Sequence, residues 1–133
     1  SLARKFLKKK GLDYPHGTGH GVGYFLNVHE GPIAISKGYK IILKPGHVIS
    51  NEPGFYKKGK FGIRIENMIY VKKVKSKVFF ENLTMVPIDK ELINFSLLSK
   101  DEKDYLLNYN LKIYSNVEKY LNYKEKFWLL SQF

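Results

Sequence analysis

Three of the four histidines, His16, His20 and His29, lie in one glycine-rich stretch, PHGTGHGVGYFLNVHEGP, at positions 15–32. Five of the chain's eleven glycines occupy the same stretch. Neutral imidazole is the commonest protein ligand for metals and carries protons near pH 7. Glycine is costly to order, so its repeated use indicates that the backbone needs close approach to another group. The stretch therefore predicts a site where histidine chemistry and tight backbone packing meet.

The spacing of His16 and His20, four residues apart, would place both on one face of a helix. Each intervening glycine disfavours a helix by about 1 kcal/mol relative to alanine, and the glutamate of the helical HExxH zinc motif is absent. In an extended chain, glycine takes every odd position from 17 to 23, so the histidines share the opposite face. A phosphate-binding loop is the alternative, but neither a Gly-Lys-Ser/Thr ending nor a dinucleotide fingerprint follows. We expect an extended segment whose bare face admits another strand, helix or ligand.

Two glutamates supply candidate acidic groups. ISNEPGFY places Glu52 at the end of a strand, and FGIRIEN places Glu66 on the polar face of a strand beside Arg64. A buried carboxylate needs a charged partner or a metal. For Glu66 alone, an ion pair with Arg64 is the simpler interpretation, and metal binding is the alternative.

The surrounding pattern predicts a mixed α and β chain. Ser99 and Glu102 match a capping box that opens a long amphipathic helix. Trp128 is expected to anchor packing in the tail. The remaining expectations are a helix over 1–10 ended by Gly11, short strands at 41–43 and 47–51, a turn at Pro53-Gly54, strands over 61–77 and 82–89, and a helical turn or tail over 125–133.

Composition narrows the classes of function. The net charge is +11, but Arg4 and Arg64 are the only arginines and the lysines are scattered, so we expect a solvated basic surface and no nucleic-acid partner. No apolar run approaches the roughly 20 residues of a membrane span, so no membrane partner is expected. The opening residues do not form a signal peptide, and the absence of cysteine excludes disulfides. We expect a cytoplasmic protein.

HGTGHGVGYFLNVHEGP, NEPGFY and FGIRIEN, in this order and spacing, closely resemble the catalytic domain of the aminopeptidase P (Xaa-Pro aminopeptidase) family, above all its eukaryotic cytosolic type. LTMVPID and the helix from Ser99 resemble that type's tail. The resemblance implies an α+β pita-bread fold, with a curved antiparallel sheet, flanking helices and two divalent metal ions. It also implies a metallopeptidase that releases the N-terminal residue from peptides with proline in second position.

The resemblance assigns roles to matching positions. His20, Glu52 and Glu66 fall on metal ligands, and Glu52 also falls on the group that contacts the bridging water. His16 and His29 fall on histidines that line the substrate site, with His29 placed to meet the scissile carbonyl. The remaining matches, Arg64 and Tyr56, fall on residues that orient an aspartate ligand. One imidazole among carboxylates is a hard donor set, so Mn²⁺ is the expected metal.

Two aspartate ligands of the family have no counterpart in this chain, whose aspartates are Asp13, Asp89, Asp101 and Asp104. We therefore expect residues 1–88 to be the second half of the pita-bread domain and 89–133 to be a carboxyl-terminal helical extension. The missing first half would be a partner of this chain, and the chain alone is expected to be inactive.

Other interpretations remain. A prolidase or a methionine aminopeptidase would share the fold, but its histidine segment has a different sequence. A pita-bread module that binds proteins or RNA without catalysis would explain the basic charge, yet such modules typically lose their metal ligands. The helix from Ser99 could also serve formation of a homodimer.

Overall fold

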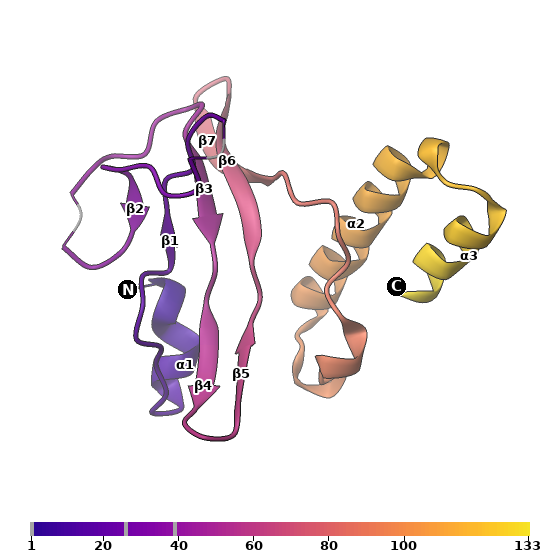
Figure 1. The fold of residues 1–133 in the computed structure, drawn as a ribbon, viewed down its shortest axis with the longest axis horizontal. Helices are drawn as coiled ribbons and strands as arrows, with labels where there is room; N and C mark the ends of the chain where they lie inside the picture. The colour runs from indigo at the N-terminus through magenta and orange to yellow at the C-terminus, as the bar shows by residue number, and fades with distance from the viewer. Residues whose placement is uncertain (1, 26, 39) are drawn as a thin grey trace. The chain divides into compact units, whose positions relative to one another are not determined.

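The computed structural model describes residues 2–25, 27–38 and 40–133, and the chain divides into two compact units, Ser1–Thr84 and Met85–Phe133. The first unit holds the described strands and the second is helical (Figure 1). The division expected after residue 88 stays a prediction, because compact units need not coincide with the two parts of a fold.

The first unit opens with a short helix, as predicted. A 3-10 turn at Leu2–Arg4 leads into α1 (Lys5–Lys9), and Gly11 follows with φ of 70°. Glycine adopts this left-handed conformation without a Cβ penalty, which is why it commonly ends helices. The prediction that Gly11 ends the helix is confirmed.

The centre of the first unit is a long hairpin interrupted halfway. Strand β3 (Val48–Asn51) pairs with β6 (Asn67–Val74), and β4 (Gly54–Lys57) pairs with β5 (Phe61–Arg64). Val48 pairs with Tyr70 and Gly54 pairs with Arg64, so both halves keep one antiparallel register. Figure 1 shows β3 running on into β4 and β5 running on into β6.

This hairpin corrects two predictions. The turn lies at residues 58–60, where Gly59 has φ of 71°, whereas Gly54 of the predicted Pro53-Gly54 turn begins β4. The single strand predicted over 61–77 is divided, because the ladder stops at Ile65 and Glu66 and β6 ends at Val74. Proline lacks the N–H that a ladder needs, so Pro53 helps to explain the interruption.

Three further strands are described in this unit, and two predicted strands do not form. Strand β7 (Lys77–Asn82) pairs with β6, and β2 (Ala34–Ile35) pairs with β1 (Gly19–His20). Residues 83–89 do not form a strand. The last hydrogen bonds between β6 and this segment are those of Met68, whose amide donates to Thr84 Oγ1 at 2.8 Å and whose carbonyl accepts from the Leu83 amide. Residues 41–43 are not a strand either; the Ile42 side chain there is 79% exposed.

The glycine-rich stretch lies along β3 as an extended segment. The amide of Glu52 donates to the Thr18 carbonyl at 2.7 Å, and that of Val22 donates to the Val48 carbonyl at 3.0 Å. A Cβ added at Gly19 would overlap the carbonyl of Ser50. The prediction that bare glycines admit a neighbouring strand is therefore confirmed at Gly19, although among the described residues of the stretch only Gly19–His20 forms a regular strand, which pairs with β2.

The second unit is built on α2 (Lys100–Val117) and α3 (Tyr123–Ser131), accompanied by short 3-10 turns at Lys90–Leu92, Phe95–Leu97 and Glu118–Tyr120. Its core contains Tyr109, Ile113 and Leu129. Trp128 is 61% exposed, so the prediction that it anchors packing is wrong, and its neighbour Leu129 is the buried residue. Among the described residues, no helix is long and apolar enough to cross a membrane.

The capping box predicted at Ser99 is confirmed, because Ser99 and Glu102 each bond to the other's backbone amide. Ser99→Ala should lower the free energy of unfolding of the helical unit by about 1 kcal/mol, the usual value of an N-cap. Urea denaturation followed by circular dichroism measures it. Ser115→Ala is the matched control, because Ser115 lies inside the same helix and bonds only its own turn; equal losses in both variants would contradict the assignment.

The same cap predicts a dependence on pH. The Ser99 backbone amide and then its hydroxyl bond Glu102 and lower the pKa of that carboxyl below its ordinary 4.5. A lowered pKa in the folded state means that the contribution is complete above pH 4.5 and is lost as the pH falls through the folded value. Comparing urea midpoints of the native chain and Glu102→Gln should show a difference at pH 7 that shrinks below pH 4.5; a constant difference would contradict it.

Candidate metal centre

Pairing of the glycine-rich stretch with β3 brings His20 to Glu52. Gly21 bridges Ile49 in antiparallel register, so His20 lies opposite Ser50, and Glu52 follows two residues further on the same face. The His20 Nε2 atom is 3.2 Å from Glu52 Oε1. Glu52 is only 8% exposed, so its charge requires close partners.

The hydrogen bonds of His20 determine what its ring offers to Glu52. His20 Nδ1 lies 2.9 Å from the Gly21 carbonyl oxygen. A carbonyl only accepts, so Nδ1 carries the proton, and in a neutral ring the Nε2 lone pair faces the carboxylate. Two electron-rich atoms this close need a proton or a cation between them. Metal-binding histidines characteristically donate their other N–H to a backbone carbonyl, so this pair fits a metal ion.

Glu66 lies across the interrupted hairpin from Glu52. Continuing the shared register of the two halves across the gap pairs Glu52 with Glu66 and Pro53 with Ile65. Like charges at opposed positions repel unless a cation intervenes. The Glu66 side chain is exposed, and in the described part of the chain no three His, Asp or Glu side chains form a group that could hold a metal. Glu66 as a third ligand therefore stays a prediction.

Arg64 supplies a positive charge at this gap. Its Nη1 atom lies 3.0 Å from Glu52 Oε2, so its ion pair is with Glu52, whereas the sequence favoured one with Glu66. The hydrogen bond to the Tyr56 hydroxyl raises the pKa of Arg64, and the charges of Glu52 and Glu66 raise it further. The guanidinium stays charged and holds the Glu52 carboxylate in place through this ion pair.

His16 joins the same network through Tyr56. His16 Nδ1 donates to the Gly17 carbonyl at 2.7 Å, which leaves Nε2 to accept from the Tyr56 hydroxyl at 2.7 Å. That hydroxyl accepts in turn from Arg64 Nε at 2.8 Å. The Tyr56 ring lies over Gly54 and Gly62, where an added Cβ would overlap it. A chain of hydrogen bonds thus connects His16 through Tyr56 and Arg64 to Glu52.

His29 lies against the outer side of the pair. Its ring and that of His20 have centroids 4.0 Å apart with 30° between the planes. His29 is exposed, whereas His20 is partly buried. The structure therefore brings His16, His20, His29, Glu52, Tyr56 and Arg64 into one region of the first unit.

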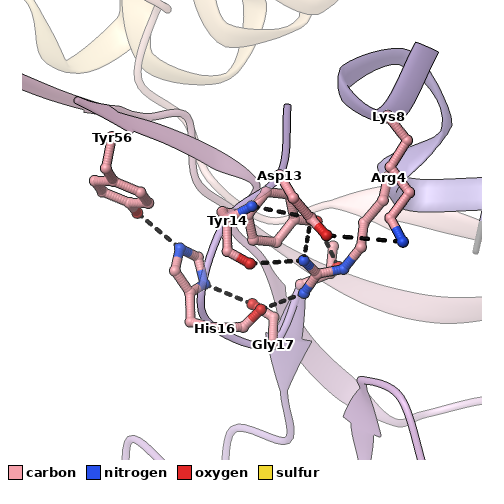
Figure 2. A network of polar contacts seen from close by, with 8 residues as sticks. Arg4, Lys8, Asp13, Tyr14, His16, Gly17 and Tyr56 are labelled. Carbon is pink, nitrogen blue, oxygen red and sulfur yellow. Dashed lines mark hydrogen bonds and ion pairs between the residues drawn. The ribbon is translucent and has the colours of Figure 1, made fainter. Parts of the chain in front are cut away.

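Sequence reasoning missed the residues that fix this region. Ser50, 1% exposed, donates to Glu52 Oε1 and accepts from the His20 amide, both at 2.9 Å. Its place two residues before Glu52, on the same strand face, was the available signal. Tyr14 and Thr18 are buried and share a hydroxyl contact of 2.6 Å. Arg4 contacts the backbone at Tyr14 and His16 (Figure 2), but nothing in the sequence distinguishes it from a surface cation.

An imidazole lone pair beside a buried carboxylate is the donor chemistry of a protein site for a divalent metal. Residues 1–73 match the model of metallopeptidase family M24, and residues 77–132 match that of the carboxyl-terminal region of peptidase M24. The chain belongs to metallopeptidase family M24.

The curated relatives include proteins named "Probable Xaa-Pro aminopeptidase P". The one from Fusarium vanettenii is 51% identical over 90% of this chain and 21% of its own length. The one from Botryotinia fuckeliana is 52% identical over 88% of this chain and 20% of its own length. The chain thus spans about a fifth of the length of these relatives.

Solved structures show the same relationship. The X-prolyl aminopeptidase of Caenorhabditis elegans, described as a cytosolic enzyme with a di-nuclear active site, is 42% identical with a TM-score of 0.87. The match covers 98% of this chain and 23% of that one. The Pyrococcus furiosus prolidase is 36% identical with a TM-score of 0.54, over 62% of this chain and 22% of that one. The α+β pita-bread fold predicted from the sequence is confirmed.

The hydrogen-bonded chain from His16 to Glu52 can be tested at its middle. Tyr56→Phe removes the hydroxyl that serves both His16 and Arg64, and should lower the free energy of unfolding by about 1 kcal/mol. Urea denaturation measures the change. Tyr24→Phe is the matched control, because the Tyr24 side chain is 92% exposed. If both variants unfold at the same urea concentration as the native chain, the hydroxyl does not hold the network.

Proposed function

We propose that this chain is the carboxyl-terminal part of the catalytic domain of a metal-dependent Xaa-Pro aminopeptidase. The observation that carries the proposal is the His20 Nε2 atom 3.2 Å from an oxygen of buried Glu52, with His20 Nδ1 bonded to the Gly21 carbonyl. Its surroundings match the chemistry, because Ser50 and Arg64 hold the carboxylate in place. Relatives about 50% identical carry the name Xaa-Pro aminopeptidase P.

In this proposal His20, Glu52 and Glu66 hold two divalent metal ions together with acidic ligands from a preceding segment. The di-nuclear active site named for the Caenorhabditis elegans enzyme supports two ions. Mn²⁺ is the proposed metal because one imidazole among carboxylates is a hard donor set. The position of Glu66 opposite Glu52 in the extended register supports its inclusion.

The preceding segment is proposed to cover apolar surface of the first unit. Large apolar side chains of this unit are strongly exposed; examples are Leu2 at 86%, Phe6 at 71% and Phe25 at 80%. Large apolar side chains that are exposed in this number are commonly covered by another part of the protein. We therefore expect the 133-residue chain alone to bind metal weakly and to be inactive.

Bound metal ions would supply an activated water and Lewis-acid polarisation of the substrate carbonyl. His29 stands at the exposed side of His20 and is proposed to donate to the scissile carbonyl oxygen. Glu52 is proposed to accept a proton and pass it to the leaving proline nitrogen. His16 is proposed to line the substrate site, and Tyr56 and Arg64 to keep Glu52 oriented through the contacts that join them.

We also propose that the protein is cytoplasmic and forms a homodimer. The word "cytosolic" in the description of the Caenorhabditis elegans enzyme supports the location. The alternatives are a prolidase or methionine aminopeptidase relative and a pita-bread binding module without catalysis. The intact His20–Glu52 pair favours catalysis over the binding module.

A peptide panel tests the proposed activity. With Mn²⁺, the full-length protein should release the first residue of Xaa-Pro-Xaa tripeptides and leave Xaa-Pro dipeptides uncut, as followed by chromatography. Glu52→Gln should lower kcat at least about 100-fold, because it removes the candidate ligand. Glu91→Gln, on an exposed turn of the helical unit, is the control.

Cleavage of the dipeptides instead would identify a prolidase. No cleavage of either class by the metal-loaded protein would contradict the proposed enzyme and support the binding module. Cleavage by the isolated 133-residue chain would contradict the claim that its site is incomplete.

A further inference from the structure

Arg4 makes a set of contacts that its place on a short surface helix does not require. Its Nη1 atom donates to Asp13 Oδ1 at 2.5 Å and to the Tyr14 carbonyl at 2.7 Å, and its Nη2 atom donates to the His16 carbonyl. The guanidinium carbon stands 3.9 Å from the centroid of the Tyr14 ring. Figure 2 shows these contacts converging on the segment that leads into His16.

The geometry suits arginine alone. Guanidinium presents five donors in a rigid planar fork and stacks on aromatic rings, whereas lysine offers a single point charge on a flexible stem. The Arg4 side chain is 18% exposed, so its contacts are largely shielded from water. Lys8 approaches Asp13 only at 3.7 Å and is 56% exposed, which makes it a peripheral partner of the same carboxylate.

We propose that Arg4 is a positioning residue for His16 and, through His16, for the Tyr56 hydroxyl. The proposal rests on the proposed function for its kinetic consequence, but the contacts themselves do not. Arg4 bonds carbonyls at Tyr14 and His16, which fixes the backbone on both sides of Pro15. That backbone aims His16 Nε2 at the Tyr56 hydroxyl 2.7 Å away.

The Tyr56 hydroxyl connects His16 to Arg64, and Arg64 in turn contacts Glu52. Tyr56 donates to His16 and accepts from Arg64 Nε, and Arg64 Nη1 donates to Glu52 Oε2. Loss of the hydrogen bonds from the Arg4 guanidinium frees the segment that carries His16, so the Tyr56 hydroxyl loses its acceptor. The aim of the His16 ring then relaxes, whereas the direct ion pair of Arg64 with Glu52 remains.

The His20–Glu52 pair itself does not depend on Arg4. Strand pairing with β3 and the Ser50 hydroxyl hold those two side chains. Loss of Arg4 should therefore affect the handling of substrate more than the affinity for metal. A purely structural role would instead lower kcat/KM, the affinity for metal and the thermal stability together.

The experiment compares Arg4→Gln, Arg4→Lys and the control Lys8→Gln in the full-length protein. Three quantities are measured: kcat/KM on an Xaa-Pro-Xaa tripeptide, the Mn²⁺ Kd by titration calorimetry, and the melting temperature. Arg4→Gln should lower kcat/KM roughly 10-fold, the usual cost of a supporting residue, with the Mn²⁺ Kd unchanged. Arg4→Lys should recover only part of the loss, and Lys8→Gln should match the native protein.

A fourth readout needs no activity. Diethyl pyrocarbonate modifies unbonded imidazole nitrogen, and mass spectrometry locates the product. His16 should react severalfold faster in Arg4→Gln than in the native protein, while His47, which bonds the Lys44 amide elsewhere, provides the internal reference. If Arg4→Gln does not fold, the same comparison is made with Arg4→Lys.

Unchanged His16 reactivity together with unchanged kcat/KM would overturn the proposal. A parallel loss of Mn²⁺ affinity and melting temperature would also overturn it, since that is the signature of a structural role. If the native protein cleaves no tripeptide, the proposed function fails, and the reactivity of His16 still decides whether Arg4 holds it.

Discussion

The antiparallel pairing of the glycine-rich stretch with β3 is the constraint on which the candidate metal centre depends. It places His20 opposite Ser50, and Glu52 follows Ser50 by two residues on the same strand face. The imidazole and the carboxylate therefore meet through strand pairing, without a special loop conformation. Gly19 makes this approach possible, because a Cβ there would overlap the Ser50 carbonyl. The glycines and histidines of the stretch therefore serve one purpose: the glycines admit the strand that carries the partner of the histidine.

Around that pair, charge and hydrogen bonding hold the buried Glu52 carboxylate in place. Arg64 neutralises Glu52, Tyr56 orients Arg64, and His16 accepts from Tyr56. The interrupted hairpin explains why this is necessary, since its register would set two glutamates opposite each other. Such an arrangement is unfavourable without a cation, and Arg64 supplies a positive charge at this point.

The sequence predicted what depends on local chemistry and failed where pairing decides. The Ser99 cap, the stop at Gly11 and the extended glycine-rich stretch follow from short-range rules, and all were confirmed. The turn at Gly59 was missed because the Pro53-Gly54 pair gives a stronger turn signal, and only pairing of β4 with β5 shows which is used. Ser50 and Arg4 were overlooked for a similar reason, since each acts through a partner distant in sequence.

The most direct measurement of the central claim is anomalous diffraction at the manganese edge from crystals of the full-length protein grown with MnCl₂. The account predicts strong peaks within bonding distance of His20 Nε2 and the carboxylate of Glu52. Manganese bound elsewhere, with the His20 ring turned away from Glu52, would contradict the account.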